Sequence, residues 1–117
     1  MSTKQSYTDY ILDQLVQLKN VSVRKMFGEY ALYCDNKVVG LICNNSLFIK
    51  ITPPGLAYVG QDFSEGYPYP GAKASMLINE DQIEDGQWLS RLVEITSDNV
   101  KPSSIKKSRS QQATIIK

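Results

Sequence analysis

Residues 23–52 of the chain read VRKMFGEYALYCDNKVVGLICNNSLFIKIT, and this stretch decides the fold. It is rich in β-branched and aromatic residues, which favour strands. Two polar pairs interrupt it, Asp35-Asn36 and Asn44-Asn45, and these residue types tolerate the positive φ of two-residue hairpin turns. Gly28 indicates a bend or bulge. The stretch therefore predicts an antiparallel meander, with a strand on each side of Gly28 in residues 23–34, followed by strands at 37–43 and 46–52.

Strict alternation of side chains along this meander predicts two sheet faces, and both are largely apolar. One face is expected to carry Ala31, Tyr33, Val38, Gly40, Ile42, Leu47, Ile49 and Ile51, and the other Tyr30, Leu32, Val39, Leu41, Phe48 and Lys50. Helices would cover only one face of such a sheet. The second face would then be covered by a loop or the tail of the chain itself, or by another subunit.

The segments that flank the meander predict helices. Tyr7, Ile11, Leu15 and Leu18 recur at helical spacing, with Leu12 and Val16 widening the stripe, so an amphipathic helix is expected at about 5–19. Pro54 can open a short helix that runs to Val59. Residues 75–79 predict a last strand. A second long helix is expected from Glu80-Asp81, with an apolar stripe of Ile83, Trp88, Leu89, Leu92, Val93 and Ile95.

These elements indicate an α+β fold in one domain. We expect two layers, with an antiparallel sheet of about four to five strands and the N- and C-terminal helices packed on it. A chain of 117 residues fits a single core. No apolar run approaches the ~20 residues needed to span a bilayer, and MSTKQSYTDY lacks the apolar segment of a secretory signal. A cytoplasmic protein that does not enter a membrane is expected.

Charge divides the chain into two parts. Residues 1–100 hold 8 basic and 12 acidic side chains, a balance of −4, whereas residues 101–117 hold five basic side chains and no acidic one. The second part is also rich in Ser and Gln. We therefore expect a folded domain at 1–100 and a flexible basic tail at 101–117. Such a tail either aids solubility or makes weak, salt-sensitive contacts with phosphates.

The residues that usually build catalytic or metal sites are scarce. The chain has no histidine, which removes every Ser-His-Asp or Cys-His arrangement. Cys34 and Cys43 would lie at opposite ends of a hairpin, roughly 20 Å apart, too far for a disulfide. We expect both thiols to be reduced and buried. No enzymatic activity, no metal and no cofactor are therefore expected.

The loop at residues 66–73, GYPYPGAK, is the other distinctive stretch. Its prolines restrict φ and favour an extended, ordered segment. Either the rings of Tyr67 and Tyr69 plug the edge of the sheet, or the loop presents Lys73 at the surface.

Several of these motifs together resemble the N-terminal domain of the TfoX/Sxy family, over about residues 6–98. They are RKMFG at 24–28, the hairpin at 35–36, LFIK at 47–50, YPYPGAK at 67–73 and the Trp88-Leu89 helix. The resemblance implies a two-layer α+β fold like that of secretion chaperones. It also implies a role in the regulation of bacterial competence for DNA uptake, beside the transcription machinery. No enzymatic activity is implied. The family's full-length regulators carry a second, helical C-terminal domain. A TfoX-like protein without it could act as an adaptor.

The family motifs also point to candidate binding residues on or beside the sheet: Arg24, Lys25, Lys50, Tyr67, Tyr69 and Lys73. The four cations could converge on a phosphate or on an acidic segment of a partner, or could be ordinary surface charges. Two functions are carried forward. The first is a regulatory or adaptor domain that binds another protein, or a second copy of itself as a homodimer. The alternative is a nucleic-acid-associated module that uses the basic tail and the Lys50/Lys73 region, with weak and salt-sensitive binding.

Overall fold

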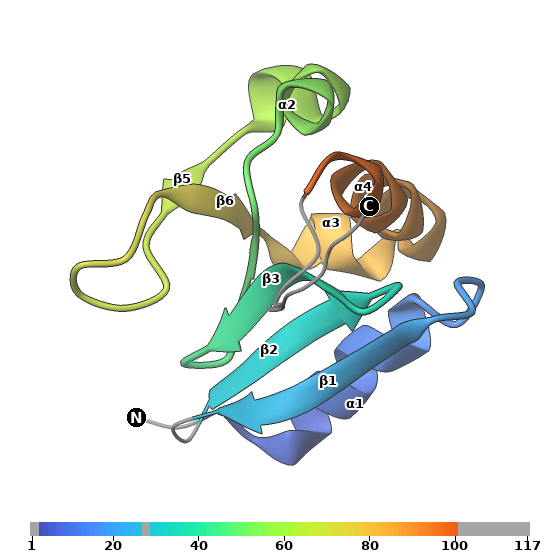
Figure 1. The fold of residues 1–117 in the computed structure, drawn as a ribbon, viewed down its shortest axis with the longest axis vertical. Helices are drawn as coiled ribbons and strands as arrows, with labels where there is room; N and C mark the ends of the chain where they lie inside the picture. Colours follow the sequence, from blue (N-terminus) through green and yellow to red (C-terminus); the bar gives the residue numbers. More distant parts are fainter. Residues whose placement is uncertain (1–2, 27–28, 101–117) are drawn as a thin grey trace, which may run out of the picture.

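The protein is a two-layer α+β domain, seen in a computed structural model that describes residues 3–26 and 29–100 (Figure 1). The elements follow the order α1(Gln5–Gln14), β1(Val21–Met26), β2(Glu29–Cys34), β3(Lys37–Cys43), β4(Ser46–Ile49), α2(Pro53–Val59), the 3-10 turn η1(Gly60–Asp62), β5(Glu65–Gly66), β6(Ser75–Ile78), α3(Glu80–Glu84) and α4(Gly86–Asn99). Both the basic tail at 101–117 and the expected bend at Gly28 lie outside the described residues.

The sheet is antiparallel and has the strand order β1-β2-β3-β4-β6-β5. The predicted meander is confirmed as β1 to β4. Its two turns have positive φ at Asp35 and Asn36 and again at Asn44 and Asn45, as two-residue hairpins require. β5 was not predicted, because a strand of two residues leaves no pattern in the sequence.

A β-bulge changes which residues share a face. The register runs Tyr33↔Val38 and then Leu32↔Gly40, so Val39 is an extra residue in β3. The expectation of strict alternation through the hairpin was wrong for this reason. The face that packs on the helices carries Leu32, Ile42, Leu47, Ile49, Met76 and Ile78, all of them buried.

The opposite face of the sheet is called the open face here. It carries Arg24, Met26, Ala31, Tyr33, Val38, Leu41, Cys43, Phe48 and Leu77, which share one side through the paired register. Figure 1 shows α1 on the far side of β1 and β2 from the viewer, and the segment between β5 and β6 projecting away from α4.

The helical layer differs from expectation in two places. α1 ends at Gln14, because Leu15 leaves helical geometry and Leu15 and Leu18 continue in tight turns. Ile11 and Leu15 are buried as expected, but Val16 is 81% exposed and does not belong to the stripe. The expected long second helix is broken at Asp85, whose carboxylate accepts a hydrogen bond from the Trp88 amide and so starts α4.

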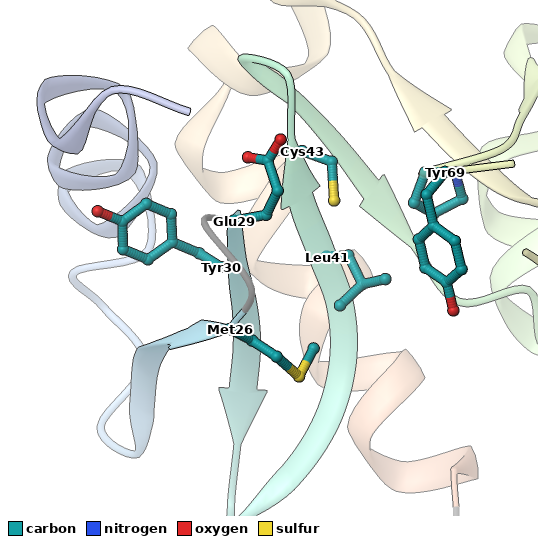
Figure 2. Close-up of a pocket in the computed structure, with 7 residues that line it drawn as sticks. Met26, Glu29, Tyr30, Leu41, Cys43 and Tyr69 are labelled. Carbon is teal, nitrogen blue, oxygen red and sulfur yellow. The ribbon is translucent and has the colours of Figure 1, made fainter. Parts of the chain in front are cut away.

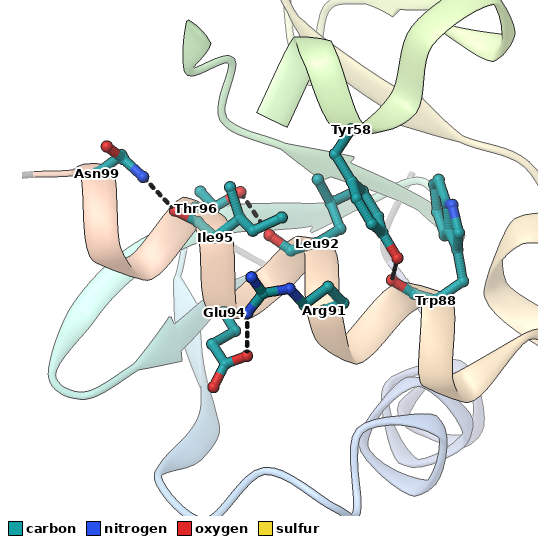
Figure 3. Close-up of polar contacts among 8 residues, drawn as sticks. All are labelled: Tyr58, Trp88, Arg91, Leu92, Glu94, Ile95, Thr96 and Asn99. Atoms are coloured by element: carbon teal, nitrogen blue, oxygen red, sulfur yellow. Dashed lines mark hydrogen bonds and ion pairs between the residues drawn. The ribbon is translucent and has the colours of Figure 1, made fainter. Parts of the chain in front are cut away.

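α4 also anchors α2 to the layer (Figure 3). The rings of Tyr58 and Trp88 stack with their centroids 5.5 Å apart, and the Tyr58 hydroxyl donates to the Trp88 carbonyl at 3.1 Å. Thr96, which is fully buried, donates to the Leu92 carbonyl at 2.9 Å. The hydroxyls of Tyr58 and Thr96 therefore both have hydrogen-bond partners, as polar groups removed from water require.

Candidate functional site

The open face of the sheet is hollowed into a groove with two parts. The first is an apolar cavity of about 500 Å³ lined by Met26, Glu29, Tyr30, Leu41, Cys43, Pro68 and Tyr69. The second is a cavity of about 480 Å³ lined by Gly40, Leu41, Lys50, Ile51, Pro68, Tyr69 and residues 71–75, and it is called the lysine cavity here. Leu41, Pro68 and Tyr69 line both, so the two cavities form one continuous groove.

The apolar cavity is built by β1, β2, β3 and the loop before β6 (Figure 2). Leu41 and the Met26 side chain stand on the sheet, and Tyr69 faces them from the loop. The Tyr30 ring turns away from them towards α1, so Tyr30 contributes to the cavity near its backbone. Met26 is 42% exposed and Tyr69 56% exposed, which leaves this apolar surface open to solvent.

The loop wall owes its shape to a turn. The Ala72 amide donates to the Tyr69 carbonyl at 3.0 Å, with Pro70 and Gly71 between them and φ of +85° at Gly71. This is the arrangement of a type II β-turn, which favours Pro and Gly at those positions. The loop is therefore not extended throughout, contrary to expectation. The rings of Tyr67 and Tyr69 do not plug the sheet edge, since both are more than half exposed.

Glu29 closes one end of the apolar cavity and is fully engaged. One carboxylate oxygen accepts from the Thr3 amide at 2.8 Å and from the Thr3 hydroxyl, and the other accepts from the Asn44 amide at 3.1 Å. This clamp ties the N-terminal segment to the β3–β4 turn. Burial raises the pKa of the neighbouring Cys43 thiol, and the Glu29 charge raises it further. Cys43 is therefore held as a neutral thiol that packs, not as a nucleophile.

The lysine cavity brings together three of the candidate residues, Lys50, Tyr69 and Lys73. Desolvation lowers the pKa of Lys50, and the positive charge of nearby Lys73 lowers it further. In the described part of the chain the only ion pair is Arg91 with Glu94 on α4, so neither lysine has an acidic partner there. Two close cations without a counter-charge are a favourable place for an anion.

The other candidate residues lie elsewhere. Arg24 is on the open face, where its guanidinium carbon lies 5.1 Å from the centroid of the Tyr33 ring. Three strand spacings, roughly 14 Å, separate its strand from that of Lys50. Lys25 points to the opposite face of β1. Tyr67 is exposed and lines neither cavity of the groove. The four cations thus do not converge, and only Lys50, Lys73 and Tyr69 meet in the groove.

The candidate residues named from the sequence did not include the apolar side chains that line the groove, among them Met26, Leu41 and Cys43. The bulge at Val39 explains why Leu41 was missed, because strict alternation assigned Leu41 to the same face as Leu32. The sequence did contain an indication for Met26, since this residue lies inside the RKMFG motif that carries the family resemblance.

A family model, the TfoX N-terminal domain, matches residues 13–99. The chain belongs to the TfoX N-terminal domain family. The match spans β1 to α4 and so includes every residue that lines the groove. The chain is also similar to a protein of Spirochaeta aurantia described as an uncharacterized 12.7 kDa protein in the trpE 5′ region. The two are 38% identical over 97 residues, which cover 83% of each chain.

The described part of this TfoX-type domain has neither a helix that could cross a membrane nor a side-chain cluster that could hold a metal ion. No helix in residues 3–26 and 29–100 is long and apolar enough to cross a membrane. Within the same residues no group of His, Cys, Asp and Glu side chains is placed to hold a metal ion. Both cysteines are free and buried, as expected.

Proposed function

We propose that this chain is a non-enzymatic regulatory or adaptor domain that acts by binding another protein in the groove of the open face. The observation that carries the proposal is the exposed apolar surface formed by Met26, Leu41 and Tyr69. Apolar side chains gathered in a concave site are typical of an interaction surface. A cytoplasmic role in the regulation of competence, as the family resemblance implies, is part of the same proposal.

A comparison of two leucines tests this function. The full chain and its Leu41→Asp variant are used to select from a phage-displayed library of short random peptides. Leu56→Asp is the matched control, because Leu56 is 37% exposed on α2 and lies outside the groove. We expect peptides that bind the wild-type chain and Leu56→Asp but not Leu41→Asp. Peptides that bind all three proteins equally would contradict the proposal, with circular dichroism used to check that each variant is folded.

Lys50 and Lys73, which have no ion-pair partner in residues 3–26 and 29–100, support a second candidate, a nucleic-acid-associated module that uses these lysines and the basic tail. The exposed rings of Tyr67 and Tyr69 could stack on bases beside them. Against it stands the balance of −4 in residues 1–100, which repels phosphates. Fluorescence anisotropy of labelled duplex DNA at low and physiological salt decides this point. This candidate would be favoured if a fragment of residues 1–100 bound the DNA at physiological salt and if the substitution Lys50→Glu abolished that binding.

A further inference from the structure

The two ends of the groove differ in chemistry, and this difference describes the partner. One end is formed by Met26, Cys43 and Leu41, which offer apolar contacts. The other end is formed by Lys50 and Lys73, which offer two ammonium groups. An occupant that satisfies the whole groove therefore needs an apolar side chain and an anionic group.

The basic tail of the chain does not meet this requirement. Residues 101–117 carry five basic side chains and no acidic one, so the charges of Lys50 and Lys73 repel the segment. A second copy placed about a two-fold axis through the groove fares no better. Such an axis offers each groove only the same surface of the other copy, whose one carboxylate, Glu29, is already held by the Thr3 hydroxyl and two backbone amides, so no free anionic group reaches Lys50 and Lys73.

The charge distribution of the domain favours an acidic partner at this place. Most acidic residues of the domain lie on the helical layer, at α1, η1, α3, α4 and their ends. The open face carries Arg24, Lys50 and Lys73 against the single carboxylate of Glu29, which is already held by the Thr3 hydroxyl and two backbone amides. A negatively charged segment is therefore attracted to the open face although residues 1–100 as a whole are acidic.

The strand register gives the spacing between the apolar and anionic contacts. Leu41 pairs with Phe48, and Lys50 lies two residues further along on the same face. Two residues along a strand and one strand across correspond to roughly 8 Å between Leu41 and Lys50. In an extended peptide, side chains two residues apart point the same way and lie roughly 7 Å apart. The two spacings match.

Resting on the proposed function, we propose that the groove binds an extended, acidic segment of a partner protein, in which an apolar side chain is followed two residues later by Asp or Glu. The apolar side chain packs between Leu41 and Tyr69. The carboxylate lies between the ammonium groups of Lys50 and Lys73. A volume of about 480 Å³ around the lysines leaves room for the carboxylate and its neighbours.

The test uses the same phage-displayed library of random peptides on four forms of the full chain. They are the wild type, the double variant Lys50→Glu/Lys73→Glu, the single charge-reversal control Lys25→Glu and Leu41→Asp. Lys25 is a suitable control because it is exposed on the opposite face of β1. We expect the wild type and Lys25→Glu to select peptides with an acidic residue two positions after an apolar one. The double variant should lose them.

Synthetic peptides then give the size of the effect. The tightest selected peptide and its counterpart with Gln in place of the acidic residue are compared by fluorescence anisotropy. We expect the Gln peptide to bind the wild type about tenfold more weakly, and the difference to shrink as salt is raised. The double variant should lose this preference and bind the Gln peptide at least as tightly as the acidic one, because its two new carboxylates repel the acidic residue.

The remaining outcomes separate the two proposals. Peptides that require Leu41 but carry no acidic residue, and that bind the double variant as well as the wild type, would overturn the inference and leave the proposed function standing. If no selected peptide depends on Leu41, the proposed function fails as well. The inference is also overturned if a short DNA duplex displaces the acidic peptide at lower concentration than the unlabelled peptide does. A dimer of the chain that Leu41→Asp dissociates would overturn it too, since a second copy would then be the occupant.

Discussion

The two faces of the sheet differ in how far their side chains are buried. On the helix-covered face, Leu32, Ile42, Leu47 and Ile49 are completely buried. On the open face, Leu41 is partly exposed and Met26 keeps 42% of its surface in water. Both faces are apolar, so hydrophobicity alone does not tell them apart. The difference teaches that the helix-covered face holds the fold together, while the open face leaves apolar side chains such as Met26 accessible to solvent.

The largest expected effect comes from removing a side chain from the covered face. Leu47→Ala should lower the free energy of unfolding by about 2–5 kcal/mol, because it leaves a cavity among buried neighbours. Leu41→Ala on the open face should cost about 1 kcal/mol or less, since water can reach the space. Urea denaturation of both variants gives the comparison. Equal losses would mean that the open face is part of the core.

Substitutions at two glycines test the same difference between the faces, with a smaller expected loss of stability. A Cβ at Gly40 would collide with the Phe48 carbonyl oxygen and would lie 3.1 Å from Cδ1 of Ile49 on the covered face. Gly40→Ala should therefore cost about 1–3 kcal/mol, because the backbone has to shift. At Gly66 the nearest atom is Cε2 of the Phe48 ring, at 2.9 Å. This atom belongs to a side chain and not to the backbone, so Gly66→Ala should cost less in the same urea experiment. The reverse order would contradict the assignment of the two faces.

The covered layer should also respond to alkaline pH through Tyr7. Burial, with smaller contributions from Glu80 and Tyr10, raises the pKa of Tyr7 from 10.0 to about 12. A raised pKa in the folded state means that this contribution to stability is complete below pH 10 and is lost as pH rises towards 12. Urea midpoints of the wild type should fall over this interval more than those of Tyr7→Phe. Parallel curves would show that Tyr7 titrates as in the unfolded chain.

The smallest expected effect lies on the open face, at Lys50. Its pKa is lowered by desolvation and then by Lys73. Since the folded state disfavours the charged form, stability should rise slightly as pH increases from the lowered pKa towards the ordinary value of 10.5. Lys73→Gln should raise the pKa of Lys50, as measured by NMR titration of the labelled side-chain amine. An unchanged pKa would show that the two ammonium groups do not interact.

The sequence predicted the hairpins well because their turns depend on local chemistry. Asp35-Asn36 and Asn44-Asn45 have the residue types that positive φ demands. The bulge at Val39 has no such signal, since it arises from how two strands pack, and it reversed the faces of half the meander. The break at Asp85 was likewise missed, although an Asp before Gly86 is a good N-cap.

The candidate site was predicted in part. Lys50, Tyr69 and Lys73 were found through the family motifs and do meet in the groove. Arg24 and Lys25 were grouped with them, but neighbouring residues of a strand point to opposite faces, and β1 is three strands away from β4. The order of the strands in the sheet determines which lysines share a groove. The spacing of residues along the sequence does not predict that order.

The central claim is that the open face, and not the helical layer, meets the partner. It is tested most directly by photo-crosslinking in cells, with p-benzoylphenylalanine placed at Tyr69 in the groove or at Val16, which is 81% exposed beyond the end of α1. We predict a discrete adduct with another protein from position 69 that disappears when Lys50→Glu/Lys73→Glu is added, and no such adduct from position 16. An adduct from position 16 alone, or one from position 69 that persists in the double lysine variant, would contradict the account.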